Sequence, residues 1–258
     1  MKENEIKNMS LHELLEYTGS MTDMIEKGSK SVPVCFNHML ERYLYEYWNN
    51  CTEDEYNVNT EPYNAAYIAM GNIYHASGDQ KDAVKSYEHA VKVSPADLDA
   101  RFSLAMELRS LGKWEDMKKC VSEAYDYIFT KADIAQYYRY MGVYQLENYH
   151  PDKALALYRY SILFSRSQTA DAEIGFLKDA GTDMTEMDTE KLRKIVSGEN
   201  IPLQPDPATI GITFKVGKNE LEHGDISYGK LLLRSVWELT GDEEAGVLSA
   251  DRDRKSVV

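Results

Sequence analysis

The sequence predicts an all-α fold that is built from successive helical hairpins. Two observations support this prediction. Between residues 65 and 95, apolar and small residues recur every three or four positions, which is the helical period, and the phase restarts at Gly78. The same pattern then returns about 34 residues later and again after residue 135. Two helices joined by a tight turn explain the first observation, and repetition of that hairpin explains the second.

The first hairpin is expected to contain one helix over about 62–76 and a second helix that starts after Gly78. The second helix should stop before Pro95, because proline disfavours helical geometry in the residue that precedes it. Gly71 and Ala83 are expected to face each other, so that their small size lets the two backbones approach closely. The surrounding space is predicted to be filled by Tyr67, Tyr74 and Tyr87.

The small residues and the turn residue recur in two further copies of this hairpin. In the second copy Ala105 stands where Gly71 stands in the first, and Gly112 occupies the turn. In the third copy Gly142 takes the small position, and Tyr149 replaces the turn glycine. The three copies cover residues 64–97, 98–131 and 135–168.

The period and these positions resemble the tetratricopeptide repeat. The copy over 64–97 matches at nearly every signature position, with Tyr67 where the family often has tryptophan. The resemblance implies a right-handed α-α superhelix, a solenoid of about three to five hairpins with residues 62–168 at its centre. Tetratricopeptide proteins typically bind an extended or helical peptide in the concave groove of the solenoid. The resemblance therefore implies a protein-protein interaction module, an adaptor or scaffold, without enzyme activity.

The residues expected to line the concave groove follow from the helical phase of the first helix in each copy. They are Ile68, Asn72, His75, Asp99, Phe102, Met106, Arg109, Gln136, Arg139, Tyr140 and Val143. Phe102 and Met106 fit a core position equally well, and Arg109 and Arg139 also fit an ordinary exposed surface.

The partner is expected to be a basic or apolar protein segment rather than an acidic one. Chaperone-binding members of the family clamp an acidic C-terminal peptide with two asparagines, two lysines and an arginine. Asn72 coincides with one of these asparagines. The other clamp positions are occupied by Ile68, Ser103, Gln136 and Tyr140, which cannot form the same clamp.

The N-terminal flank, residues 1–61, is expected to form another helical hairpin and could be a degenerate repeat. Ser10 and Glu13 form a capping-box pattern that opens a helix to about Lys27. The apolar face of this helix is predicted to include Leu14, Leu15, Met21 and Ile25. Pro33 is expected to open the second helix, with an aromatic-rich stripe formed by Phe36, Leu40, Tyr43, Leu44, Tyr47 and Trp48. A homodimer through this hairpin is a further possibility.

The C-terminal flank, residues 169–258, is expected to be less regular. One helix should end at Gly181 and a short helix should start at 188 or 189. An irregular segment is then predicted over 200–224, because it contains several prolines and alternates Ile210, Ile212, Phe214 and Val216. A helix over 226–239 should cap the solenoid, and the tail over 251–258 is expected to fray. In the alternative hypothesis for function, residues 201–224 fold across the groove and close a small-molecule or regulatory site.

Composition narrows the possible functions. The chain has 29 Lys and Arg residues against 43 Asp and Glu residues, and its net charge of -14 repels nucleic acids and anionic lipids. No signal-peptide pattern and no run of about 18 apolar residues is present, so we expect a cytoplasmic protein without a membrane span. Cys35, Cys51 and Cys120 are expected to be reduced thiols. The six histidines lack metal-ligand spacing and no catalytic motif stands out, so we expect no metal, no cofactor and no catalysis.

Overall fold

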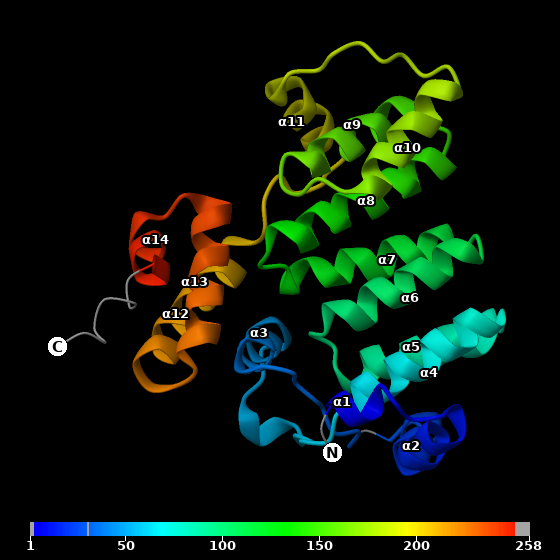
Figure 1. The fold of residues 1–258 in the computed structure, drawn as a ribbon, viewed down its shortest axis with the longest axis vertical. Helices are drawn as coiled ribbons and strands as arrows, with labels where there is room; N and C mark the ends of the chain where they lie inside the picture. The colour runs from blue at the N-terminus through cyan, green and yellow to red at the C-terminus, as the bar shows by residue number, and fades with distance from the viewer. Residues whose placement is uncertain (1–2, 30, 251–258) are drawn as a thin grey trace. The chain divides into compact units, whose positions relative to one another are not determined.

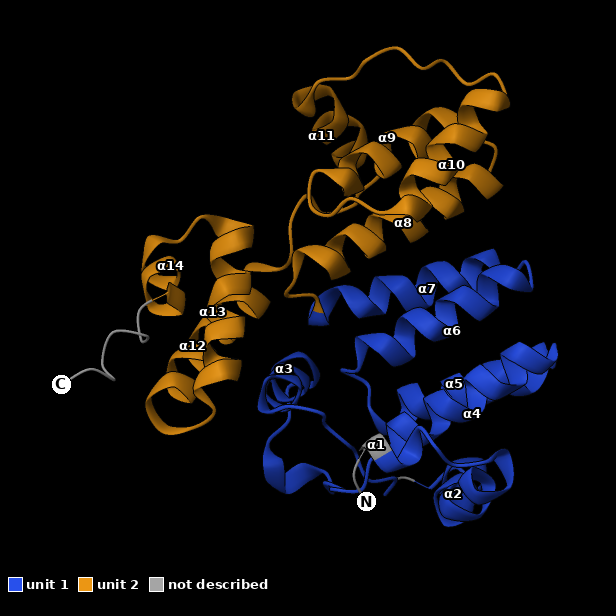
Figure 2. Cartoon of the chain, viewed as in Figure 1, with its two compact units in different colours: residues 1–127 blue, residues 128–258 orange. Residues whose placement is uncertain are grey.

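The computed structural model describes residues 3–29 and 31–250, and within these residues the secondary structure is helical, with no β-strand beyond one isolated bridge between Val34 and Val58. The prediction of an all-α fold is confirmed. The chain divides into two compact units, residues 1–127 and 128–258 (Figure 2). The division falls after the last helix of the second hairpin and before the first helix of the third, and each unit is described by itself below.

Unit 1 contains the first two hairpins (Figure 1). The helices α4 and α5, which run over Tyr63–Ser77 and Gln80–Val93, pack against each other. The helices α6 and α7, which run over Leu98–Ser110 and Trp114–Ala124, form the second pair, and α5 packs against α6. A short 3-10 turn over Tyr125–Tyr127 follows. The predicted hairpins and their turns are therefore confirmed.

The close approach of α4 and α5 depends on Gly71, whose neighbour is the ring of Tyr87. A Cβ atom added to Gly71 would lie 2.7 Å from Cδ1 of Tyr87, which no ordinary packing permits. Ala83, the predicted neighbour of Gly71, is fully buried, but the ring of Tyr87 occupies the space over the glycine. The third hairpin repeats the arrangement, because a Cβ on Gly142 would lie 2.8 Å from Cε1 of Tyr158.

The turn between the two helices of each hairpin requires a left-handed backbone conformation. Gly78 has φ = +81° and Gly112 has φ = +68°, which glycine adopts without steric penalty. Tyr149 takes the same place in the third hairpin with φ = +63°, and its side chain is 91% exposed. An aromatic residue therefore occupies a backbone conformation that favours glycine.

The N-terminal helix α2, over Leu11–Glu26, begins at the predicted capping box. The backbone N–H of Ser10 donates to Oε2 of Glu13 at 2.7 Å, and the N–H of Glu13 donates to Oγ of Ser10 at 3.4 Å. Leu14 and Met21 are buried, as expected for the apolar face. Leu15 is 45% exposed, so its assignment to that face was wrong. A shorter helix, α1, runs over Glu3–Ile6.

The next helix, α3, runs over Met39–Asn49 and not from Pro33 as predicted. Residues 34–36 are extended instead, because their backbone groups bond to the segment before α4 and to the end of α5. The helix α2 packs against α4, whereas α3 lies beside the turn Tyr125–Tyr127, so the structure does not show the hairpin expected of residues 1–61. Within the aromatic stripe Leu40 and Leu44 are buried, while Tyr43 and Tyr47 are exposed. Self-association through this helix stays a prediction.

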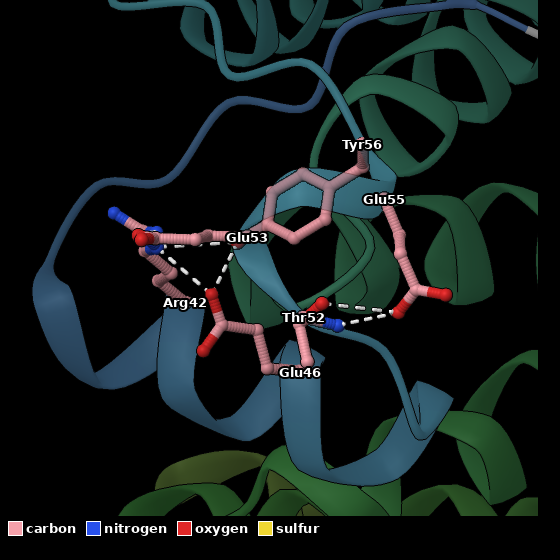
Figure 3. A network of polar contacts seen from close by, with 6 residues as sticks. All are labelled: Arg42, Glu46, Thr52, Glu53, Glu55 and Tyr56. Carbon is pink, nitrogen blue, oxygen red and sulfur yellow. Dashed lines mark hydrogen bonds and ion pairs between the residues drawn. The ribbon is translucent and has the colours of Figure 1, made fainter.

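A network of polar contacts holds the loop after α3 against that helix (Figure 3). Nε of Arg42 donates to Oε1 of Glu46 at 3.0 Å, and the hydroxyl of Tyr56 donates to the same oxygen at 2.6 Å. Arg42 also pairs with Glu53, which lies in the 3-10 turn η1 over Glu53–Glu55. The network fixes the path of the chain from α3 towards α4.

Unit 2 begins with the third hairpin, formed by α8 over Lys131–Glu147 and α9 over Pro151–Ile162. Pro151 stands at the first helical position, where proline costs no hydrogen bond because an N–H there would have no intrahelical acceptor. The helices α10 over Gln168–Asp179 and α11 over Thr189–Gly198 both pack against α9. They confirm the two helices predicted after the repeats.

The irregular segment predicted over 200–224 is wrong for most of its length, because residues Pro207–His223 form the helix α12. Asp206 caps this helix by accepting a hydrogen bond from the N–H of Ala208 at 2.7 Å, and Pro207 occupies the first helical position. The prolines therefore precede or start the helix and do not interrupt it. The residues that α12 buries have helical spacing: Thr209, Thr213, Val216, Gly217 and Leu221.

The helix α13, over Ile226–Thr240, pairs with α12 to form a further hairpin, and α14, over Glu243–Ala250, packs on α13. Gly217 takes the place that Gly71 has in the first hairpin, and a Cβ on it would lie 2.9 Å from Cγ of Leu233. The helix predicted over 226–239 is thus present. Its main neighbours are α12 and α14, and it also contacts α8 of the third hairpin, so its role as a cap stays a prediction. The tail over 251–258 lies outside the described residues.

Tyrosine hydroxyls attach flanking segments to the hairpins in both units. In unit 1 the hydroxyl of Tyr67 lies 2.8 Å from Oγ1 of Thr22 in α2. In unit 2 the hydroxyl of Tyr138, at the matching position of the third hairpin, donates to the carbonyl of Pro202 at 2.8 Å. The hydroxyl of Tyr160 donates to the carbonyl of Leu203 at 2.9 Å. The segment before α12 is therefore fixed to the third hairpin of the same unit.

Candidate functional site

The candidate site in unit 1 is the surface of α4 and α6, which carries the predicted groove residues of the first two hairpins. Four of these residues are exposed, and we call the surface that they form the α4–α6 face: Asn72, His75, Asp99 and Met106. Ile68 and Arg109 are half-buried. Phe102 is only 6% exposed and belongs to the core, which corrects its assignment to the groove.

Asn72 has an oriented side-chain amide. The hydroxyl of Tyr87, on the second helix of the same hairpin, donates to Oδ1 of Asn72 at 2.8 Å. Burial, with the nearby Glu107 as a smaller cause, raises the pKa of Tyr87 to about 12, so the phenol remains a donor at neutral pH. The oxygen of the Asn72 amide is thus engaged, and its Nδ2 group is left as an exposed donor. A peptide carbonyl is the natural acceptor for such a donor.

His75 rests on a buried carboxylate that the sequence analysis missed. Nδ1 of His75 lies 2.6 Å from Oε2 of Glu107, which comes from α6 and is fully buried. Oε1 of Glu107 has no hydrogen-bond partner among the described residues. The signal for Glu107 was present, because it lies between the buried Leu104 and Leu108 on the apolar side of the predicted helix. The pair links α4 to α6 beneath the exposed imidazole edge.

Polar groups gather at the end of this face where α6 begins. Nδ2 of Asn64, from α4, donates to Oδ2 of Asp97 at 2.7 Å and to Oδ1 of Asn37 at 2.8 Å. The N–H of Asn37 donates to Oε2 of Glu41 in α3 at 2.6 Å. Burial, and next the charge of Asp97, raises the pKa of Glu41 to about 7.

The charge along α6 therefore differs between its two ends. Asp99 is exposed in the first turn, close to Asp97 and Glu41, and the charge of Asp99 is one of the causes that raise the pKa of Glu41. Arg109 stands in the last turn. A bound segment would meet negative charge where α6 begins and positive charge where it ends.

The predicted groove residues of the third hairpin belong to unit 2. Gln136, Arg139 and Tyr140 are half-buried, whereas Val143 is 3% exposed and is corrected to a core residue. NH1 of Arg139 donates to the carbonyl of Ser165 at 3.5 Å, and burial lowers the pKa of this guanidinium. Arg139 thus already bonds to the loop between α9 and α10, a contact that helical phase alone does not reveal.

No metal centre is evident in the part of the chain that the structure describes, since it holds no group of three or more His, Cys, Asp or Glu side chains suited to one ion. Over the same residues, no helix combines the length and the apolar character that crossing a membrane requires. Cys35, Cys51 and Cys120 are free thiols. Burial raises the pKa of Cys35 and Cys120 to about 11, which makes both thiols unreactive at neutral pH.

Comparisons with known proteins identify one part of the chain. Residues 65–97 match a family model described as tetratricopeptide repeat. No curated protein matches the chain. Among solved structures, it is similar to YrrB, described as a TPR protein with an unusual peptide-binding site, with a TM-score of 0.36 and 13% identity over 72% of this chain and 91% of that one. The chain therefore contains a tetratricopeptide repeat, at residues 65–97, within an all-α arrangement of helical hairpins.

Proposed function

We propose that the protein is an interaction module that binds an extended peptide on the α4–α6 face of unit 1. The observation that supports this most directly is the amide of Asn72, which Tyr87 orients so that Nδ2 is presented to solvent. An oriented amide donates to a peptide carbonyl with less loss of side-chain entropy than a mobile one. Met106, which is 37% exposed on α6, offers an adaptable apolar contact on the same face.

The charge distribution favours a peptide with a basic group at one end. Asp99 is exposed at the start of α6, with Asp97 behind it, and the negative charge there attracts a lysine or arginine. The net charge of -14 acts in the same direction over longer distances. An acidic peptide would be repelled on both counts, and nucleic acid is not a proposed partner.

Site-specific photo-cross-linking in the native cell extract tests this proposal. The photoreactive residue p-benzoylphenylalanine replaces Met106 on the face, and in a matched control it replaces Lys81, which is exposed on α5. We expect one protein segment to be cross-linked from position 106 and not from position 81, with the linked peptide identified by mass spectrometry. Equal cross-linking from both positions would contradict the proposed face.

The affinity of the identified segment then tests the role of Asn72. We expect Asn72→Ala to weaken binding by about tenfold, which corresponds to one hydrogen bond of about 1.4 kcal/mol. Tyr87→Phe keeps Asn72 but removes the hydroxyl that orients its amide, so a smaller loss is expected. Lys81→Ala is the control. An unchanged affinity for Asn72→Ala would remove the main support for this face.

A further inference from the structure

In the hairpin of α4 and α5, an extended segment of the chain fills a slot between the residues before α4 and the end of α5. The N–H of Cys35 donates to the carbonyl of Val93 at 2.7 Å, and Oγ of Ser94 donates to the carbonyl of Cys35 at 2.8 Å. On the other side, the N–H of Val34 donates to the carbonyl of Asn57 at 2.8 Å. The side chain of Cys35 is buried within the core of the hairpin.

The matching slot of the hairpin α12–α13 is a cavity. It has a volume of about 460 Å³ and lies within unit 2 between the residues before α12 and the end of α13 (helices in Figure 1). Gln204 and Pro205 stand on one side and Leu239 and Thr240 on the other. Leu239 and Thr240 occupy the places that Val93 and Ser94 have in the first hairpin, at the same distance along the sequence from their glycine, Gly217 or Gly71.

The correspondence rests on the shared design of the two hairpins. In both, a glycine of the first helix, Gly71 or Gly217, receives a large side chain of the second helix. In both, an aspartate caps the second helix: the N–H of Asp82 bonds to Asp79, and the N–H of Ser227 bonds to Asp225. The two slots are therefore equivalent places, one filled by the chain and one open.

We infer that the slot of α12–α13 binds an extended apolar peptide segment of a partner protein, held by the carbonyl of Leu239 as Cys35 is held by that of Val93. The hydroxyl of Thr240 differs from that of Ser94, because it already donates to the carbonyl of Val236 at 2.7 Å. The floor is apolar and consists of Ile210, Phe214 and Val236, so it suits an apolar side chain. Leu239 lies in the last turn of α13, where carbonyl groups lack intrahelical partners, and its carbonyl can accept the N–H of the peptide as Val93 does. This inference is independent of the α4–α6 face.

The two slots differ in ways that define the ligand more closely. Asn59 donates its N–H to the carbonyl of Val34 at 2.9 Å, but Pro205 stands in its place and has no N–H. The carbonyl of Leu203, which matches that of Asn57, already accepts the hydroxyl of Tyr160. The peptide would thus be bonded along one edge only, with Pro205 providing an apolar wall. The volume admits a side chain larger than the thiol of Cys35.

Gly211 provides a way to block the slot without disturbing the fold. It lines the cavity, and a Cβ added to it would have no heavy atom within 4 Å. Gly211→Phe therefore places a ring into the space, and replacing a helical glycine does not weaken α12. Gly175→Phe is the matched control, because Gly175 also lies in a helix of unit 2 with open space around its Cβ position and does not line the cavity.

The probe is a synthetic acetylated heptapeptide amide with the sequence of residues 31–37, SVPVCFN, titrated into the full chain under reducing conditions. Calorimetry gives the affinity of the peptide. The amide NMR shifts of Gly241 and Asp242, which line the slot, show whether the peptide binds there. We expect saturable binding with a Kd below about 1 mM. Gly211→Phe should weaken it at least about tenfold, while Gly175→Phe and Asn72→Ala should leave it unchanged.

Three outcomes would overturn the inference. The first is the lack of saturable binding up to about 1 mM peptide. The second is equal affinity for the parent protein and Gly211→Phe, which would place the peptide elsewhere, for example in the slot of unit 1. The third is binding only to a variant that ends at Ala250, since residues 251–258 of the chain itself would then be the occupant in place of a partner.

Discussion

The left-handed conformation of Tyr149 predicts that replacing it by glycine stabilises unit 2. The three hairpin turns make the same pair of backbone bonds: Gly78, Gly112 and Tyr149 each donate to the carbonyl three residues before them, at 3.0 Å in all three turns. The following residue, such as His150, donates to the carbonyl five residues before it, at 2.9 Å. The turns are thus equivalent in geometry and differ in which residue adopts the positive φ.

The expected gain follows from two opposing contributions. A residue with a Cβ atom loses about 1 to 2 kcal/mol in the left-handed region, which Tyr149→Gly recovers. Glycine also lowers the free energy of unfolding by about 0.5 to 1 kcal/mol, because it has more conformational freedom in the unfolded chain. The side chain is 91% exposed, so little packing is lost on its removal. The net increase in the free energy of unfolding should be about 0.5 to 1 kcal/mol.

Urea denaturation followed by far-UV circular dichroism measures this change against two controls. Tyr149→Ala keeps a Cβ atom and therefore the strain, so it should stay within about 0.5 kcal/mol of the parent protein. Gly78→Ala introduces the strain at φ = +81°, where no heavy atom would clash, and should destabilise by about 1 kcal/mol. Equal stability of Tyr149→Ala and Tyr149→Gly would refute the reasoning, because the backbone conformation would then carry no penalty.

Three further predictions test other features of the fold. Gly71→Ala should lower the free energy of unfolding by about 1 to 3 kcal/mol in urea melts, because the new Cβ meets the ring of Tyr87, whereas Gly175→Ala should not lower it. Glu41 has a folded pKa of about 7 against an ordinary 4.5, so its contribution to the free energy of unfolding is fully present below pH 4.5 and is lost as the pH rises through 7. Glu41→Gln should remove this loss of stability between pH 5 and 8. An unchanged dependence of stability on pH would contradict the assignment. Arg42→Ala should speed amide hydrogen exchange in residues 52–56 with a stability loss within about 1 kcal/mol, and unchanged exchange would show that the network does not hold the loop.

The hairpins could be predicted from the sequence because their signals are local. The helical period, the turn glycines and Pro95 specify where each helix starts and stops without reference to the rest of the chain. The helix α12 was missed because the alternation between Ile210 and Val216 resembles a strand and because prolines precede it. The aspartate and proline at 206 and 207 formed the correct signal, since aspartate caps a helix and proline is tolerated at its first position.

The candidate site was predictable only in part, because helical phase gives the direction of a side chain and not its neighbours. Phase placed Asn72 and His75 on an exposed surface, which the structure shows. Helical phase could not reveal that Tyr87 orients Asn72 or that Glu107 lies beneath His75, because each contact joins two different helices. Phe102 shares the same phase but is covered by its surroundings, and burial of this kind depends on the packing of several elements.

The tyrosine hydroxyls that reach out of the hairpins set the limits within which the protein can be shortened. A fragment of residues 62–168, cut at the edges of the recognisable repeats, would lose the hydroxyl of Thr22 from beside Tyr67 and the carbonyls of Pro202 and Leu203 from Tyr138 and Tyr160. Each loss removes a hydrogen bond with a net value of about 0.5 to 1.5 kcal/mol and exposes to water the ring that the deleted segment covers. The sequence repeats therefore mark the recognisable motif, and we expect a stable fragment to extend from α2 to at least Leu203.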